Sequence, residues 1–143
     1  MAVRVTIVGD KVVSSVKLPS LSLDYRDDPT YIAGNQIYVP AELPSVVADG
    51  CLRVMKACGL LFSGIDLILK DDGTYVFLEA NSSPAYLDIE QKTKTPITGA
   101  LVNYLLKLAN LPNDERDMLQ QARTARSFVA YAHPFTPTKS IDP

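Results

Sequence analysis

Two acidic residues and an asparagine near the middle of the chain have the types and spacing of a metal site. Asp66, Glu79 and Asn81 belong to two apolar runs that lie on either side of a short polar stretch, residues 71–73. Apolar runs of this length around a Gly-containing turn predict a β-hairpin. Carboxylate and amide oxygens are hard ligands, which suit Mg²⁺ or Mn²⁺. The first candidate site is therefore this hairpin.

The pairing of the two strands decides whether these oxygens can meet. If Asp72-Gly73 is a two-residue turn, Asp66 lies opposite Glu79 and Gly64 lies opposite Asn81. Opposite side chains on one face have Cβ atoms roughly 4.5–5.5 Å apart, so two carboxylates there repel unless a cation lies between them. A three-residue loop would shift the register by one and put the carboxylates on opposite faces. An ordinary exposed acidic hairpin without any ligand is a further alternative.

Several segments of the chain resemble ATP-grasp ligases, whose metal hairpin has a G-x-D strand followed by E-x-N-P-x-P. The corresponding segments here are G-I-D-L-I (64–68) and F-L-E-A-N-S-S-P (77–84). Three others resemble the ribosomal-protein-S6-glutamate-ligase-like branch in the same order: V-R-V-T-I-V-G-D-K-V (3–12), D-Y-R (24–26) and I-E-Q-K-T-K-T-P-I (89–97). The chain looks most like the graspetide or microviridin type, which modifies ribosomally made peptides. The likeness covers residues 3–109.

This resemblance implies an ATP-dependent ligase that joins a carboxylate to an amine through an acyl phosphate. The implied cofactors are ATP and Mg²⁺ (or Mn²⁺). Arginine holds phosphates and carboxylates bidentately, which suits a catalytic role. The implied site residues are Asp66, Glu79 and Asn81 for the metal, Leu78 for the adenine of ATP, and Arg4 and Arg26 for catalysis. The alternatives are surface positions for the arginines and a core position for Leu78.

The chain departs from the family pattern in three respects. Ser82-Ser83-Pro84 replaces the usual continuation after the asparagine, and Lys94 stands where glycine is usual, which argues against a turn with positive φ there. The subdomain with the phosphate-gripping lysines is absent, so we expect the C-terminal half of a ligase, inactive in isolation and needing an N-terminal partner half. The competing hypothesis is a non-catalytic binding or assembly module that keeps the fold.

Composition indicates a cytoplasmic protein that binds neither nucleic acid nor membranes. The chain is 47% hydrophobic and 21% charged with net charge −2, and it has no apolar run long enough for a membrane span. Cys51 and Cys58 lie on one predicted helix, too far apart for a disulfide, and are expected to be reduced. The expected partners are nucleotide and a peptide or protein substrate.

The patterns predict an α+β fold, an antiparallel sheet with helices packed on one face. The predicted elements are a hairpin at 3–18, a long loop at 19–40, helices at 42–58, 96–110 and 114–131, and the metal hairpin at 60–81. The expected divisions are an ATP-grasp subdomain (1–111), a helical extension (112–131) and a disordered tail (132–143). Strand alternation would place Phe62, Tyr75 and Phe77 beside Glu79 as an exposed aromatic patch, which favours a homodimer.

Overall fold

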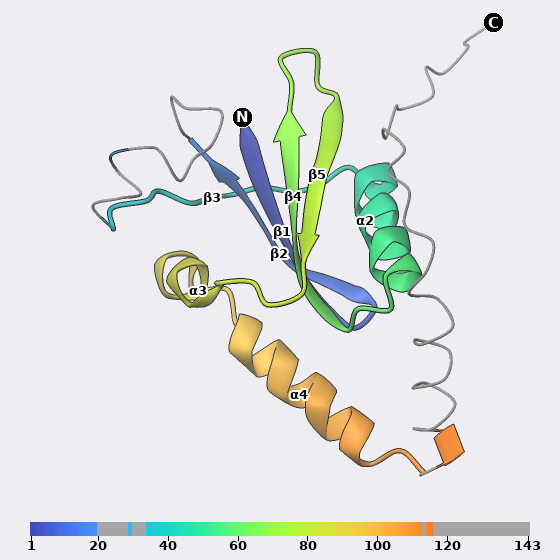
Figure 1. The fold of residues 1–143 in the computed structure, drawn as a ribbon. Helices are drawn as coiled ribbons and strands as arrows, with labels where there is room; N and C mark the ends of the chain where they lie inside the picture. The colour runs from blue at the N-terminus through green and yellow to red at the C-terminus, as the bar shows by residue number, and fades with distance from the viewer. Residues whose placement is uncertain (20–28, 30–33, 113, 116–143) are drawn as a thin grey trace, which may run out of the picture.

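A five-stranded antiparallel sheet forms the centre of the molecule (Figure 1). The computed structural model describes residues 1–19, 29, 34–112 and 114–115. The spatial order of the strands is β3-β2-β1-β4-β5, and every neighbouring pair is antiparallel. Their bounds are β1 Ala2–Val8, β2 Lys11–Leu18, β3 Val39–Pro40, β4 Phe62–Leu69 and β5 Tyr75–Asn81. The predicted α+β class is confirmed.

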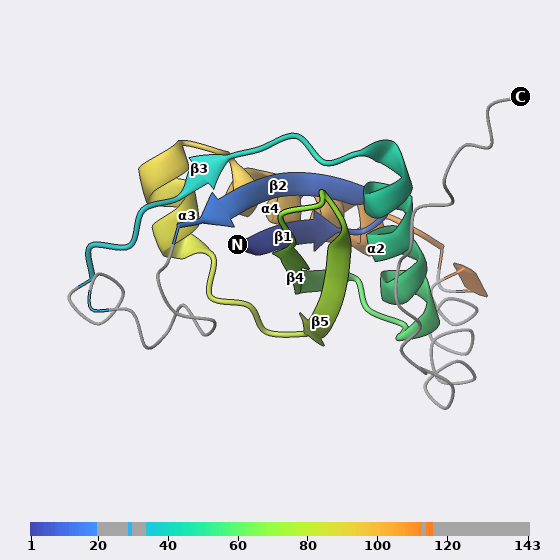
Figure 2. The same cartoon turned by 90° about the horizontal axis from the view of Figure 1, so that it is seen from above.

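Helices cover both faces of the sheet rather than one. Helix α2 (Ser45–Ala57) packs on the face that carries the odd-numbered residues of β1. Helices α3 (Leu87–Thr93) and α4 (Ile97–Ala109) begin against the opposite face, where Val16 and Leu18 of β2 are buried. Figure 2 shows α2 and α3 at opposite ends of the sheet when it is seen from above. The candidate site residues of β4 therefore have to be assigned to one of these two faces.

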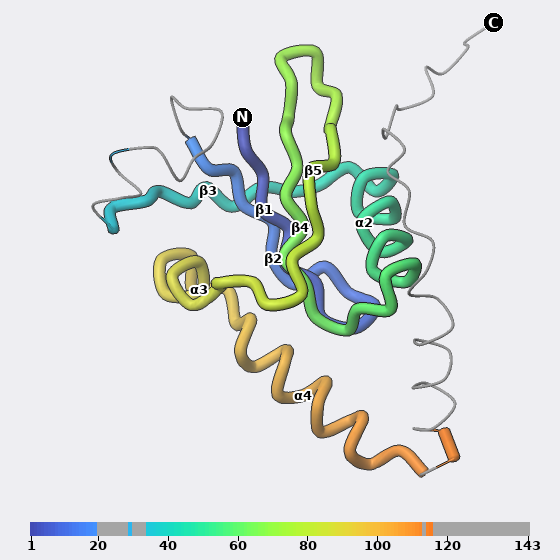
Figure 3. The backbone as a smooth tube through the Cα atoms, viewed as in Figure 1, coloured from blue at the N-terminus to red at the C-terminus, as the bar shows by residue number. Residues whose placement is uncertain are grey.

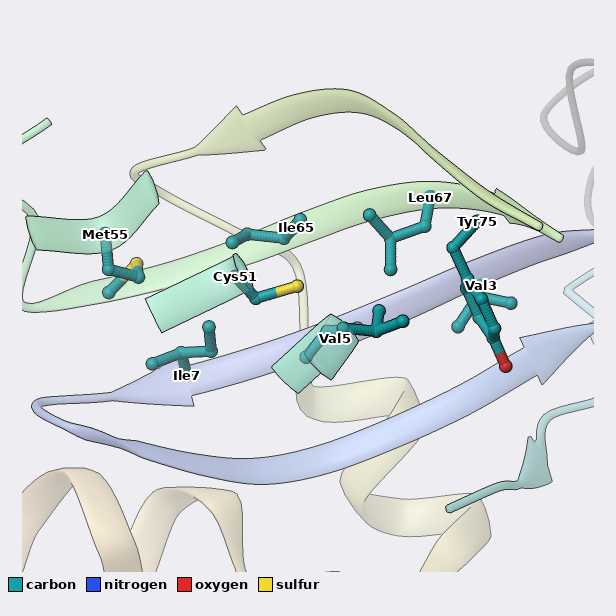
Figure 4. Packing of buried hydrophobic residues seen from close by; sticks show 9 residues of the cluster. Val3, Val5, Ile7, Cys51, Met55, Ile65, Leu67 and Tyr75 are labelled. Carbon is teal, nitrogen blue, oxygen red and sulfur yellow. The ribbon is translucent and has the colours of Figure 1, made fainter. Parts of the chain in front are cut away.

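The larger core lies between the sheet and α2. Alternate residues of β1 and β4 meet one side of the helix because successive strand side chains point to opposite faces. Figure 4 shows this packing, in which the buried residues are Val3, Val5, Ile7, Val47, Cys51, Met55, Ile65, Leu67 and Tyr75. Burial raises the pKa of the Cys51 thiol to about 11. Both cysteines are free, as the sequence predicts.

The first hairpin is confirmed, and its turn is tightly packed. Gly9, which follows β1 directly, has a φ of 62°, a conformation that L-residues with a Cβ rarely adopt. A Cβ at this position would lie 2.5 Å from the ring of Tyr104 on α4. The glycine therefore allows both the turn and the close approach of α4.

Two of the predicted helices are confirmed, and one short helix was missed. Helices α2 and α4 fall within the predicted ranges 42–58 and 96–110. Helix α3 is absent from the predicted elements because seven residues are too few to establish a 3.6-residue period. The predicted helix at 114–131 and the tail at 132–143 lie outside the described residues, apart from positions 114 and 115. Among the described helices, none is long and apolar enough to cross a membrane.

Lys94 corrects one expectation from the sequence. It ends α3 in the left-handed conformation, with φ 61°, and its amide donates to the carbonyl of Glu90. This is the helix-ending geometry that usually selects glycine. The positive-φ turn is therefore retained with a lysine, although a side chain in that region costs roughly 1–2 kcal/mol.

Candidate metal and phosphate site

The β4–β5 hairpin pairs the residues that the sequence analysis singled out. Asp66 lies opposite Glu79, and Gly64 lies opposite Asn81. The two strands and the turn that joins them can be followed in the backbone trace (Figure 3). The predicted pairing is confirmed, but it arises in a different way from the one predicted.

The connection between the strands is a three-residue loop, not the two-residue turn assumed from the sequence. Lys70 donates its amide to the carbonyl of Thr74, which leaves residues 71–73 in the loop, and Gly73 has a φ of 82°. Asp72 accepts a hydrogen bond of 2.9 Å from the Thr74 amide, and this bond lowers the pKa of its carboxyl group. A type I turn followed by a left-handed glycine is a usual three-residue hairpin loop.

A β-bulge at Leu78 restores the register. Leu67 lies opposite Phe77, whereas the next residue back, Asp66, lies opposite Glu79, so Leu78 is the extra residue. A bulge sets two residues on one strand against one on the other, and it reverses the alternation of side chains beyond it. The loop and the bulge each shift the pairing by one residue, and together they return both carboxylates to the same face.

The same bulge overturns the predicted aromatic patch. Tyr75 and Phe77 precede the bulge, so they point to the α2 face, where Tyr75 is 8% exposed and Phe77 packs against the core. Phe62 does share the face of Asp66, but it packs edge-on against Tyr86. Leu78 itself is 55% exposed. Its side chain is therefore open to a ligand rather than part of the core.

Arg4 supplies a cation for one of the two facing carboxylates, that of Asp66. It lies opposite Asp66 in the β1–β4 pairing, and its guanidinium holds both carboxylate oxygens. The Nη2 atom donates to Oδ2 at 2.8 Å, while Nε donates to Oδ1. The side chains of Arg4 and Asp66 are 9% and 13% exposed. A bidentate pair in so little solvent is geometrically well defined and stronger than a single hydrogen bond.

Gly64 makes room for this pair. A Cβ at Gly64 would lie 3.2 Å from Cδ of Arg4 and 2.8 Å from Cβ of Pro84. Gly64 has no side chain to fill the space opposite Asn81. The structure shows instead that the stem of Arg4 and the ring of Pro84 occupy that space.

The residues present fit a hard divalent cation. Glu79 and Asn81 are exposed, and within the described part of the chain Glu79 forms no ion pair. Asn81 accepts a hydrogen bond of 2.8 Å from the Ser83 amide, which orients its Oδ1 atom. A carboxylate has about four acceptor positions, so Asp66 keeps some beyond the two that Arg4 uses. No cluster of three or more His, Cys, Asp or Glu side chains occurs among the described residues, so an asparagine must complete this donor set.

The sequence as a whole places this geometry in a known family. A RimK-like ATP-grasp domain matches residues 1–105. The chain belongs to the RimK-like ATP-grasp family. The family assignment confirms the resemblance that the motifs around Asp66 and Glu79 suggested.

Individual relatives agree with this family. The probable alpha-L-glutamate ligase 1 of Shewanella sp. (strain ANA-3) is 32% identical over 120 residues, which cover 82% of this chain and 38% of that protein. The ATP-grasp ligase PsnB, solved in complex with a phosphomimetic variant of a minimal precursor, Mg and ADP, is 25% identical, with a TM-score of 0.62, over 74% of this chain and 31% of PsnB. The macrocyclase MdnC from Microcystis aeruginosa MRC, solved bound to the precursor peptide MdnA, is 29% identical, with a TM-score of 0.60. The match covers 74% of this chain and 33% of MdnC. The chain thus spans about a third of the length of these relatives.

Glu90, in a family-like segment outside the hairpin, has a structural role. The carboxylate of Glu90 accepts hydrogen bonds from the amide and hydroxyl of Thr98, in the first turn of α4. An acidic side chain at a helix N-terminus satisfies unpaired amides and complements the helix dipole. Glu90 therefore caps α4, which explains the spacing between the segment I-E at 89–90 and the start of that helix.

Lys92 is a contact residue that sequence reasoning missed. Its ammonium group donates to the carbonyls of Gly34 and Gln36 and to Asp88, and it lies 5.4 Å from the centre of the Tyr38 ring. It thereby ties α3 to the segment that enters β3. Arg26, predicted as catalytic, lies outside the described residues.

Proposed function

We propose that the chain is the Mg-ATP-binding portion of an ATP-grasp ligase that joins a carboxylate to an amine through an acyl phosphate. The observation that carries this proposal is the placement of Asp66, Glu79 and Asn81 on one face, beside a buried arginine. Oxygen donors next to a fixed guanidinium suit a site that handles phosphate together with a divalent cation. Membership of the RimK-like ATP-grasp family supports the choice of reaction.

Each residue has a role in this proposal. Glu79 and Asn81 bind Mg²⁺ (or Mn²⁺) from the open side of the sheet, and Asp66 joins them from the neighbouring strand. The bound metal neutralises charge that develops on the phosphates during transfer. Arg4, and in the same way Arg26, orients the acyl phosphate or the substrate carboxylate. The exposed side chain of Leu78 packs against the adenine of ATP.

The substrate we propose is a peptide or protein. PsnB and MdnC, which the fold resembles, were solved with a precursor and a precursor peptide, and PsnB also with Mg and ADP. The chain spans about a third of the length of these ligases. We therefore propose that it is inactive alone and works with a further ATP-grasp portion, in the cytoplasm, where its free cysteines stay reduced. The alternative is a binding or assembly module that keeps this fold without the reaction.

Paramagnetic Mn²⁺ tests the metal site without requiring turnover. We expect Mn²⁺ to broaden the backbone amide signals of residues 64–66 and 79–83 at the lowest concentrations, because the ion binds between these strands. Glu79→Gln should weaken the effect at least about tenfold, since it removes one charged ligand. The measurement is a titration followed by heteronuclear NMR.

Asp49→Asn is the matched control for that titration. Asp49 is an exposed carboxylate on α2, on the other face of the sheet, and its substitution changes the net charge by the same amount. Equal broadening in the wild type, Glu79→Gln and Asp49→Asn would show that Mn²⁺ binds only diffusely, and the proposed function would lose its basis. Broadening in the absence of any nucleotide binding would favour the non-catalytic alternative.

The homodimer remains a proposal, now with a different surface. Of the aromatic residues first assigned to it, Tyr75 is buried and the other two are partly buried. In contrast, Val102, Leu105 and Leu106 of α4 are 47%, 55% and 57% exposed. They follow the i, i+3, i+4 spacing of one helix face, and α4 has no acidic residue to oppose a second copy. Light scattering at micromolar concentration should give the mass of a dimer, and Leu105→Glu should give a monomer. A monomeric wild-type chain would exclude this association.

A further inference from the structure

The Arg4–Asp66 pair has a consequence for metal binding that the ligand set alone does not imply. Both oxygens of Asp66 accept hydrogen bonds from Arg4 on the neighbouring strand β1. Glu79 pairs with Asp66 from β5, the strand on the opposite edge of β4, and its carboxylate is exposed and without an ion pair in the described region. A divalent cation that approaches Asp66 meets a guanidinium already in place. Like charges at that separation repel each other, most strongly where little solvent screens them.

The guanidinium cannot simply move aside. The stem of Arg4 is confined by the backbone at Gly64, where even a Cβ would come within 3.2 Å of Cδ, and the ring of buried Pro84 closes the same space. The pair itself is 9% and 13% exposed, so a charge left behind by either partner would be poorly solvated. An anion that binds Arg4 would offset its charge and so reduce its repulsion of a cation at Asp66.

We infer that Arg4 couples anion binding to metal binding at this hairpin. Without an anion, Arg4 repels a cation at Asp66, and a metal ion binds mainly through Glu79 and Asn81. When a phosphate or carboxylate binds Arg4, that repulsion falls and the remaining acceptor positions of Asp66 serve as the third ligand. By thermodynamic linkage, the metal then strengthens anion binding by the same factor. This inference rests on the proposed function, and it adds that the cation and the acyl phosphate or nucleotide phosphate bind together rather than independently.

The test measures Mn²⁺ affinity by calorimetry and by NMR line broadening, with and without sodium sulfate as a phosphate-like dianion. Sodium chloride at matched ionic strength is the reference, and a titration of Mn²⁺ with sulfate alone gives the correction for their direct association. For the wild-type chain we expect sulfate to raise Mn²⁺ affinity by about fivefold or more, which is the usual range of such coupling. No rise in the wild type would overturn the inference without any variant.

Two variants separate the contributions of charge and geometry. Arg4→Gln removes the competing charge, so Mn²⁺ alone should bind about fivefold more tightly than in the wild type, and sulfate should have no further effect. Arg4→Lys keeps a charge but loses the two-pronged contact, so sulfate should still raise the affinity, to a smaller extent. Amide spectra establish that each variant is folded.

The outcomes distinguish this inference from the proposed function. Equal Mn²⁺ affinity in the wild type and Arg4→Gln, or an equal sulfate effect in both, overturns the coupling while leaving the metal site intact. Absence of localised Mn²⁺ broadening at residues 79–83 in the wild type refutes the metal site itself. A sulfate effect that survives in Arg4→Gln assigns anion binding to a different residue and so also contradicts the role of Arg4.

Discussion

Asp66→Ala is expected to lower the free energy of unfolding by about 2–4 kcal/mol, the largest effect of any single change at the site. Removing one member of a buried ion pair takes away the charge that compensates the other member, which costs about 3–5 kcal/mol in full burial and less where solvent or another contact compensates the remaining charge. Arg4 is 8% exposed, so its guanidinium would retain little water once the carboxylate is gone. Urea denaturation with linear extrapolation measures the change.

Two further variants make this expectation specific. Replacing both partners by apolar residues, Arg4→Met with Asp66→Leu, should recover most of the lost stability, because both buried charges are then removed together. Asp88→Ala breaks the exposed pair with Lys92 and should cost less than about 1 kcal/mol. A loss at Asp66 as small as that at Asp88 would mean that the Arg4–Asp66 pair is solvated rather than buried.

The hairpin shows how much of the site could be predicted from the sequence. The residue types, the hairpin and the facing of Asp66 and Glu79 were all predicted, because apolar periodicity and a Gly-containing turn determine them locally. The route to that register was wrong in two places that cancel. Gly73 in the third loop position is a local signal for the longer loop, and it could have been recognised. The bulge at Leu78 has no comparable signal, since a leucine in a strand looks regular.

The positions of Tyr75 and Phe77 show that strand alternation alone can assign side chains to the wrong face of the sheet. A single extra residue at Leu78 moves Tyr75 and Phe77 from the site face to the α2 core. The error had a functional consequence, since it removed the surface first assigned to dimer formation. An apolar pattern predicts that a residue is buried more reliably than it predicts the face on which this occurs.

The resemblance to the family motifs likewise predicted which residues matter, but not what their side chains contact. Arg4 was predicted to act on a substrate anion, and the sequence contained no indication that it holds Asp66, which lies 62 residues away. Long-range pairing of this kind depends on the strand order β2-β1-β4, which no local pattern determines. Glu90 belongs to a segment that resembles the family, and only its hydrogen bonds to Thr98 show that it caps α4. Residues with a known position in a motif therefore still need their contacts to be observed.

Gly64→Ala is expected to lower the free energy of unfolding by about 1–3 kcal/mol and to disturb the metal site at the same time. Gly64 lies in β4 without positive φ, so the backbone tolerates a side chain and the cost is steric. The new methyl group would come within 2.8 Å of Pro84 and 3.2 Å of Arg4, and inserting a methyl group into packed space costs roughly this amount. The loop after Asn81 or the Arg4 stem must then shift.

Gly99→Ala is the matched control because it adds the same methyl group where there is room. Gly99 is exposed on α4, and the nearest atom to a new Cβ lies 3.9 Å away. Alanine favours the helix over glycine by about 1 kcal/mol, so this variant should gain stability while Gly64→Ala loses it. In Mn²⁺ titrations, only Gly64→Ala should change the broadening at residues 79–83. If both variants were equally stable and bound Mn²⁺ alike, Pro84 and Arg4 would not be confined by Gly64, and the positioning of Asp66 would need another explanation.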